Sequence, residues 1–247
     1  MKKTGKGGES MMVYVLSDIH GNERRFNSIM QQIDLRPEDT LYVLGDVIDR
    51  HPGGIRILRK LMAMPNAGMI LGNHEYMMLR ALGCPYDDYR DDGRARDHWY
   101  RNGGEVTHNH LKRIRKSLRQ EIVDYLRALP LSIDISVNGK DYKLVHGAPV
   151  EEYDHQLPYI NATHYAVWKR QENPDRSDCP YTLIFGHTPT KYYQACVPME
   201  LWYGGNMIGI DCGGGYPEKG PNSEYGRLAC LRLDDGKVFY SREDDRR

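Results

Sequence analysis

Short apolar runs that end in polar residues of the same few kinds recur along this sequence, and no other feature constrains its fold as strongly. Each run is rich in Val, Ile, Leu or Tyr and is followed by Gly, Asp, Asn or His. The runs occupy residues 13–16, 41–44, 69–71, 142–145, 182–185 and 207–210. Runs of this length bounded by glycine are typical of strands that are buried on both faces. We therefore expect a sheet whose strands end in polar residues.

Helical patterns separate the first three runs. One helix face is indicated by the i, i+3, i+4, i+7 spacing of Phe26, Ile29, Met30 and Ile33, after a candidate N-cap at Asn22. A second, less regular pattern covers residues 55–62. Strand–helix–strand alternation predicts an α/β fold with a mostly parallel sheet, whose carboxyl strand ends all face one crevice.

Two segments depart from this alternation. Residues 79–129 are helical in pattern and no Pro/Gly/Ser linker bounds them, so we predict a helical insertion within the same domain. Residues 226–240 alternate like antiparallel strands around the turn signal at 234–237. The prediction is a single domain over residues 11–247, preceded by residues 1–10 as a disordered tail or a remnant of cloning.

Charge and composition exclude several classes of protein. The 247 residues include 34 Lys+Arg and 34 Asp+Glu, so the net charge is zero. This balance argues against a protein that coats nucleic acid or anionic membrane. No apolar run approaches the ~18 residues that span a bilayer. The five cysteines form no CxxC pair, which favours reduced thiols and a cytoplasmic location.

The residues at the strand ends form a set of oxygen and nitrogen ligands for metal ions. They are Asp18, His20, Asp46, Asn73, His146 and His187. Carboxylate, imidazole and amide donors without thiolate suit Mn, Fe or Zn, and this set has too many nitrogens for Ca. Six ligands exceed the needs of one tetrahedral site, so two metal ions that share a carboxylate are the economical arrangement. Such pairs favour hydrolysis of phosphate esters and related bonds.

Two further residues at the same strand ends could complete this chemistry. Arg50 is a positive group for the non-bridging phosphate oxygens, and His74 is an acid for the leaving oxygen. Each residue also has a structural interpretation when it is taken alone: Asp46 or Asp49 as a helix N-cap, and Asn73 as a turn former. The joint pattern, in which five such endings each follow a buried-strand signal, favours a site.

The ordered motifs of this chain resemble those of the calcineurin-like metallophosphoesterases. They are Asp18-x-His20-Gly21, Gly45-Asp46-x-x-Asp49-Arg50, Gly72-Asn73-His74-Glu75, His146-Gly147 and Gly186-His187. The GDxxDR and GNHE forms, and Pro189 where other branches have a second histidine, resemble the phosphoprotein phosphatase branch in its bacterial and phage form. Trp168-Lys169-Arg170 resembles its WxR segment, and Trp99-x-x-Asn102-Gly103-Gly104-x-x-x-Thr107 resembles a segment of its bacterial members.

This resemblance implies a fold and a set of roles. The expected fold is a four-layer αββα sandwich of two mixed β-sheets, with two divalent metal ions, Mn or else Fe or Zn, at the carboxyl strand ends. The first metal is expected on Asp18 and His20, the second on Asn73, His146 and His187, with Asp46 bridging. Phosphate is expected on Arg50, Arg170 and Asn73. His74, oriented by Asp49, is the expected proton donor, and a metal-bridging hydroxide attacks in line.

The resemblance leaves the substrate open. We expect a serine/threonine-type protein phosphatase that acts on a phosphorylated protein or a small phosphoester, with no nucleic acid or membrane as partner. The alternative is a symmetrical bis(5'-nucleosyl)-tetraphosphatase, which hydrolyses diadenosine tetraphosphate and resembles the same branch. A non-catalytic metal-binding scaffold is a third interpretation, but such a scaffold would be expected to lack some of these residues. Outside the motifs, Tyr192-Tyr193 could line a substrate rim, but we favour packing or turn roles for them. We interpret Glu75 as the acidic residue of a helix N-terminus.

Overall fold

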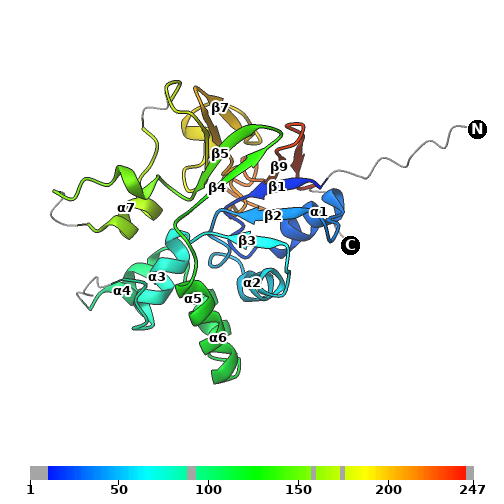
Figure 1. Cartoon of the computed structure of the whole chain (residues 1–247). Helices are drawn as coiled ribbons and strands as arrows, with labels where there is room; N and C mark the ends of the chain where they lie inside the picture. The colour runs from blue at the N-terminus through cyan, green and yellow to red at the C-terminus, as the bar shows by residue number, and fades with distance from the viewer. Residues whose placement is uncertain (1–10, 88–92, 157–159, 173–175, 243–247) are drawn as a thin grey trace, which may run out of the picture.

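A computed structural model describes residues 11–87, 93–156, 160–172 and 176–242 of the chain (Figure 1). It contains two β-sheets of five strands each. The first sheet has the order β10-β9-β1-β2-β3. Its strands are β1 (Val13–Leu16), β2 (Thr40–Val43), β3 (Ala67–Met69), β9 (Ala229–Arg232) and β10 (Val238–Tyr240). The second has the order β4-β5-β6-β8-β7. Its strands are β4 (Ser132–Val137), β5 (Lys140–Val145), β6 (Thr182–Phe185), β7 (Trp202–Gly204) and β8 (Met207–Gly209).

Both sheets are mixed, as the family resemblance implies. Strands β1, β2 and β3 are parallel, and so are β5, β6 and β8. Antiparallel strands flank each set: β9 and β10 in the first sheet, β4 and β7 in the second. The six apolar runs are therefore divided equally between two parallel sets, and do not form one sheet. The predicted hairpin near the C-terminus is confirmed by β9 and β10.

The helices surround the first sheet and extend from it. They are α1 (Glu23–Ile33), α2 (Gly54–Met62), α3 (Asn73–Ala81), α4 (Ala95–Arg101), α5 (Glu105–Leu111), α6 (Lys116–Arg127) and α7 (Ala162–Trp168), with 3₁₀ turns η1 (Val150–Glu152) and η2 (Thr190–Tyr192). Helix α1 begins where expected, because the Asn22 side chain accepts a hydrogen bond from Arg25 N at 3.1 Å. Helices α1 and α2 lie beside the first sheet, and α3 to α6 extend away from it (Figure 1).

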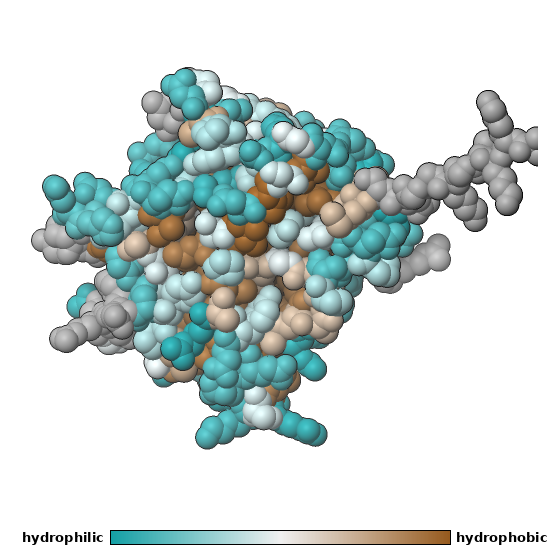
Figure 2. All heavy atoms as spheres, in the orientation of Figure 1, coloured by the Kyte–Doolittle hydropathy of each residue, from teal (hydrophilic) through white to brown (hydrophobic). Residues whose placement is uncertain are grey.

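Two large apolar clusters hold these layers together. One lies between the sheets and includes Val15, Leu144, Ile184 and Leu231. The other lies between the first sheet and the helices, and it includes Trp99 and Leu126 of the predicted insertion. The space-filling view shows apolar residues gathered near the centre of this face, with hydrophilic residues over most of its periphery (Figure 2). None of the helices in the described ranges is long and apolar enough to cross a membrane.

The insertion is helical but differs in detail from the expected pattern. The apolar residues from Leu111 to Leu126 are spaced as one helical face, yet α5 ends at Leu111 and α6 begins at Lys116. Both helices therefore contribute side chains to one apolar surface. Leu111 of α5 and Ile122 and Leu126 of α6 are almost fully buried in the same apolar cluster. The predicted tail, residues 1–10, lies outside the described residues.

Candidate metal centre

The loops that follow the parallel strands hold their polar residues in an unusual backbone conformation. Nine non-glycine residues of the described ranges have positive φ, and six of them are predicted site residues. These six are Asp18, His20, Asp46, Asp49, Arg50 and His187, with φ between 48° and 73°. Residues other than glycine adopt a positive φ at an energetic cost. They keep it only where contacts with the surrounding structure hold the backbone in place. The concentration of strain marks these loops as a functional centre.

The structure brings the predicted metal ligands into two adjoining groups. His20, Asp46 and His74 form one group, and Asp46, His146 and His187 form the other; within each, the ligand atoms lie within 4.8 Å of one another. Asp46 is common to both. Its Oδ2 is 3.6 Å from His20 Nε2, and its Oδ1 is 3.5 Å from His146 Nε2. A carboxylate between two sets of donors is the arrangement that a bridging ligand requires.

Asp18 and Asn73 complete the two groups. Asp18 Oδ1 is 3.8 Å from His20 Nε2. Asn73 Oδ1 lies 2.8 Å from His146 Nε2 and 2.9 Å from His187 Nδ1. All six residues predicted as metal ligands from the sequence therefore converge at one place. The three that precede β3, namely Asp18, His20 and Asp46, are each 2 % exposed, so protein atoms surround most of each side chain.

Three histidine rings are each held by a backbone carbonyl on one nitrogen. His20 Nδ1 is 3.3 Å from Ile48 O, and His146 Nδ1 is 2.6 Å from Leu44 O. His187 has the opposite orientation, with Nε2 at 3.1 Å from Trp168 O. Because a carbonyl only accepts, the facing nitrogen carries the proton and the other nitrogen presents a lone pair to the cluster. This is how metal-binding histidines are oriented in proteins.

The buried carboxylates of the centre are electrostatically unfavourable without cations. Burial raises the pKa of Asp18 and, to well above its usual range, that of Asp211, and the negative charge of neighbouring carboxylates adds to both shifts. Burial also acts on Asp46, but His146, His74 and His20 together hold its pKa below the usual value. Burial lowers the pKa of His187 to about 3, so this ring is a neutral ligand. Neutral imidazoles among crowded carboxylates fit two divalent cations.

Glu75 holds the loop that presents Asp46. Its carboxylate is fully buried and accepts hydrogen bonds from Asp46 N and Val47 N, each at 2.9 Å, and from Ile48 N at 3.3 Å. Glu75 does lie in the first turn of α3, as expected, but its side chain acts on the neighbouring loop. Gly72 is required beside it, because a Cβ there would lie 2.4 Å from Asp46 N.

A hydrogen-bonded chain leads from His74 into the insertion. His74 Nδ1 lies 2.7 Å from Asp49 Oδ2, and the buried Trp99 indole donates to the same oxygen at 2.8 Å. Burial lowers the pKa of His74, but Asp46 and the hydrogen bond to Asp49 outweigh it and raise the pKa above its usual value. A histidine that is protonated near neutral pH can act as a general acid.

A hollow of about 210 Å³ opens over these residues. Its lining includes Asp46, Arg50, His74 and Arg170, so the two predicted phosphate-binding arginines meet above the metal ligands. Arg50 Nη2 is 3.4 Å from His74 Nε2. Within the described part of the chain neither arginine forms an ion pair with a carboxylate, which leaves both available to an anion.

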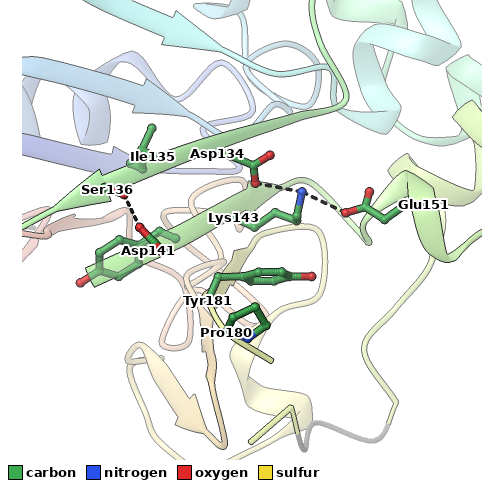
Figure 3. Close-up of a pocket in the computed structure, with 9 residues that line it drawn as sticks. Asp134, Ile135, Ser136, Asp141, Lys143, Glu151, Pro180 and Tyr181 are labelled. Carbon is green, nitrogen blue, oxygen red and sulfur yellow. Dashed lines mark hydrogen bonds and ion pairs between the residues drawn. The ribbon is translucent and has the colours of Figure 1, made fainter. Parts of the chain in front are cut away.

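A larger hollow, of about 500 Å³, lies elsewhere, over β4 and β5 (Figure 3). It contains no predicted site residue. Its lysine, Lys143, is already paired with Asp134 at 2.8 Å and with Glu151 at 2.9 Å. Because its central charge is satisfied, this hollow offers no comparable reactive group.

Sequence reasoning missed three residues of the centre. Asp211 lines the hollow and is 4 % exposed, and its position directly after the last apolar run was the available signal. Trp99 belongs to a segment that the resemblance identified without a role for the indole. Glu75 has no sequence signal that separates a helix-starting glutamate from one that binds a distant loop.

Comparison with known proteins agrees with this geometry. A model of the family described as calcineurin-like phosphoesterase matches residues 11–209. A symmetrical bis(5'-nucleosyl)-tetraphosphatase of Delftia acidovorans is 25% identical over 186 residues, which are 74% of this chain and 59% of that protein. The enzyme of the same name from Salmonella newport is 34% identical over 71 residues, 28% of this chain and 25% of that one. The chain thus matches less than two thirds of the length of these relatives.

Solved structures share the fold. A putative diadenosine tetraphosphatase has a TM-score of 0.62 at 17% identity, with 93% of this chain and 92% of that chain covered. A protein serine/threonine phosphatase from Saccharomyces cerevisiae has a TM-score of 0.56 at 15% identity, with 93% and 78% covered. At these identities the likeness establishes the fold alone.

Proposed function

The chain belongs to the calcineurin-like phosphoesterase family, and we propose that, within it, the protein is a symmetrical dinucleoside tetraphosphatase. The alignment with one such tetraphosphatase, that of Delftia acidovorans, over 74% of the chain carries this proposal. The motifs favour a serine/threonine-type protein phosphatase first and this activity second, whereas the relatives favour this activity. The proposed reaction adds water across the central P–O–P bridge and releases two nucleoside diphosphates.

The distribution of cations suits a polyphosphate. Arg50 and Arg170 line the hollow, and Lys191 lies beside Tyr192 and Tyr216, which also line it. No carboxylate among the described residues is paired with any of these three cations. A single phosphate needs one or two such partners, whereas a chain of four phosphates can engage all three.

The proposed roles follow from the contacts of each side chain. Asp18 and His20 would hold one metal ion, Asn73, His146 and His187 the other, and Asp46 both. When bound, two divalent ions, proposed to be Mn²⁺, supply an activated water and offset the negative charge of the transferring phosphate. Arg50 binds its non-bridging oxygens, and Arg170, which lines the same hollow, binds the neighbouring phosphate.

His74 would complete the bond cleavage. Asp49 holds Nδ1, which leaves Nε2 directed toward the hollow, 3.4 Å from Arg50 Nη2. From Nε2 a proton passes to the bridging oxygen as it leaves with the second nucleoside diphosphate. Trp99 keeps the Asp49 carboxylate in the orientation that this requires.

A direct comparison of substrates tests the proposal. Mn²⁺-loaded protein is given diadenosine tetraphosphate and a phosphoserine peptide side by side, and the products are separated by anion-exchange chromatography. We expect two ADP per dinucleotide and a higher kcat/KM for the dinucleotide. Release of AMP and ATP would contradict symmetrical cleavage. Preference for the peptide would replace the proposal with a protein phosphatase, and metal binding without hydrolysis of either substrate would indicate a scaffold. Asp46→Asn protein, purified in parallel, controls for contaminating hydrolases.

A further inference from the structure

The hollow over the metal centre is too small for a whole dinucleotide. Its volume is about 210 Å³, whereas pockets that enclose small organic ligands measure roughly 300–1,000 Å³. It can therefore receive phosphate groups, but a nucleoside attached to them must lie outside, on the surface around the opening. The side chains at this opening then determine which substrates the enzyme prefers.

Aromatic side chains at the opening differ in whether their rings are packed against other rings or exposed to solvent. Trp168 is stacked on two histidines, with ring centroids 5.6 Å from His98 and 5.9 Å from His164. Tyr192 is 61 % exposed, more than any other large hydrophobic side chain of the described residues. Tyr192 also lines the hollow over the predicted metal ligands, so its exposed ring lies where a nucleoside attached to a bound phosphate would have to lie.

The neighbouring tyrosine shows that Tyr192 is not simply a packing residue. Tyr193 packs inward, with its ring 5.8 Å from Phe185 and 4.8 Å from Trp202, and its hydroxyl donates to Gln171 O at 2.9 Å. Tyr192 closes η2, whose first residue, Thr190, donates its backbone N–H to Asp211 O at 2.9 Å. The turn that carries the exposed ring is therefore attached to the wall of the phosphate hollow. Of the roles that the sequence left open for this pair, packing fits Tyr193, whereas Tyr192 lies in the η2 turn and in the lining of the hollow.

Two cations flank the exposed ring. Arg170 Cζ is 5.5 Å and Lys191 Nζ is 5.7 Å from the centroid of Tyr192. Lys191 is also 4.8 Å from the Tyr216 ring centroid, and its hydrogen bond with Tyr216 raises its pKa, so it is charged. An exposed ring beside cations that have no carboxylate partner among the described residues suits a ligand with a flat aromatic part and an adjacent anionic part.

We propose that Tyr192 is a stacking platform for one nucleobase of the substrate, with Arg170 and Lys191 binding the phosphates next to that nucleoside. Arg170, Lys191 and Tyr192 together are called the outer rim below. The proposal rests on the proposed function for its choice of a nucleotide. A base that stacks on an exposed ring contributes binding energy without sequence-specific hydrogen bonds, so the platform accepts different nucleobases.

Binding of two non-hydrolysable ligands tests the outer rim. Isothermal titration calorimetry of the Mn²⁺-loaded protein compares α,β-methylene-ADP with methylenediphosphonate, which has the same phosphorus groups but no nucleoside. We expect the nucleotide to bind more tightly to the wild type. Tyr192→Ala should weaken the nucleotide about 5- to 150-fold, the range of one base–aromatic stack, without a matching change for methylenediphosphonate.

Two further variants make the result specific. Tyr192→Phe keeps the ring and should retain the nucleotide affinity. Tyr203→Ala removes another exposed tyrosine, 55 % exposed on β7, and should change neither affinity. Equal affinities of the two ligands for the wild type, or an equal loss of both in Tyr192→Ala, would overturn the platform. If Tyr192→Ala loses affinity for the nucleotide alone but the wild type does not hydrolyse diadenosine tetraphosphate, the proposed function is rejected and the platform is kept. If the wild type hydrolyses it symmetrically but Tyr192→Ala keeps its affinity for the nucleotide, the platform is rejected and the proposed function is kept.

Discussion

The ligand cluster at the strand ends and the outer rim share one hollow, but their side chains are held in different ways. Asp18, His20 and Asp46 are each 2 % exposed, and the histidines of the cluster also contact backbone carbonyls. In the outer rim Arg170 and Tyr192 are exposed and Lys191 is partly buried, and the cations beside the Tyr192 ring contact it. The side chains of the ligand cluster are each held by several contacts, whereas the exposed side chains of the outer rim can change conformation.

This difference indicates a division of labour. Chemistry at a metal centre needs donor atoms at fixed positions, which buried and doubly held side chains provide. Recognition of a nucleoside needs a flat surface and charge, which can be altered without disturbing the centre. Changes to the cluster should therefore affect metal content and kcat, and changes to the rim should affect KM.

The largest effect is expected at the shared ligand. Asp46→Asn removes the charge from the carboxylate that lies in both ligand groups, so metal affinity should fall by more than about 100-fold and hydrolysis with it. Elemental analysis after dialysis measures the metal content. Two retained ions per chain would contradict the bridging role. Changes to the cluster and changes to the outer rim would then no longer differ in their effect on metal content.

His74→Asn should separate catalysis from metal binding within the cluster. Loss of the proton donor should lower kcat about 10²–10⁴-fold on a phosphoserine peptide, whose leaving group is poor, and less on p-nitrophenyl phosphate. Metal content should stay at the wild-type value. Equal losses on both substrates, or lost metal, would mean that His74 acts as a ligand, as its place in the first group of donors also permits.

Arg170→Gln should raise KM for diadenosine tetraphosphate about 10- to 100-fold, because a charge-assisted hydrogen bond to phosphate is lost. Lys169→Gln is the matched control, since Lys169 is paired with Glu172 at 3.2 Å and does not line the hollow. Steady-state kinetics with both variants measure the effect. An unchanged KM in Arg170→Gln, or the same rise in both variants, would remove Arg170 from the rim.

The smallest effect on function is expected far from both regions. Asp39 precedes β2 at the end opposite the metal centre, and hydrogen bonds from Arg36 lower its pKa to about 2. A carboxylate with a lowered pKa stabilises the fold above its unfolded pKa, and this stabilisation is lost as the pH falls through 2. Asp39→Asn should thus cost about 2 kcal/mol at pH 7, or roughly 4–8 °C in Tm.

Thermal unfolding at several pH values checks this prediction. The difference in Tm between Asp39→Asn and the wild type should shrink between pH 4 and pH 2. Glu38→Gln is the control, because Glu38 is half exposed and lies 3.5 Å from the same arginine. A difference that does not depend on pH would show that the charge of Asp39 is not what stabilises the fold.

Much of the centre could be predicted because the change from an apolar run to polar residues marks where each strand ends. Within each sheet the parallel strands share a direction, so polar residues that follow them meet at one edge of that sheet. The structure brings the edges of the two sheets together, with Asp46 of the first beside His146 and His187 of the second. The residues predicted as ligands and as the acid do converge there. Strand β4 could also have been found, because Asn138-Gly139 is a strong hairpin signal, and both residues have positive φ.

Other features depend on contacts between segments that are distant in the chain. The apolar stripe from Leu111 to Leu126 does not reveal that the helix breaks, because both helices keep their faces on the same core. Glu75 and Asp46 are 29 residues apart, and only the packing of α3 against the β2 loop joins them.

From the sequence alone we could predict which donors follow which strands, and we expected two metal ions, two phosphate-binding arginines and a histidine acid. Tertiary structure decided which of two identical neighbours, Tyr192 or Tyr193, meets the solvent. The physical reason is that strand periodicity is a local property of the chain. Exposure depends on every element that packs nearby, and here on how Thr190 attaches η2 to Asp211.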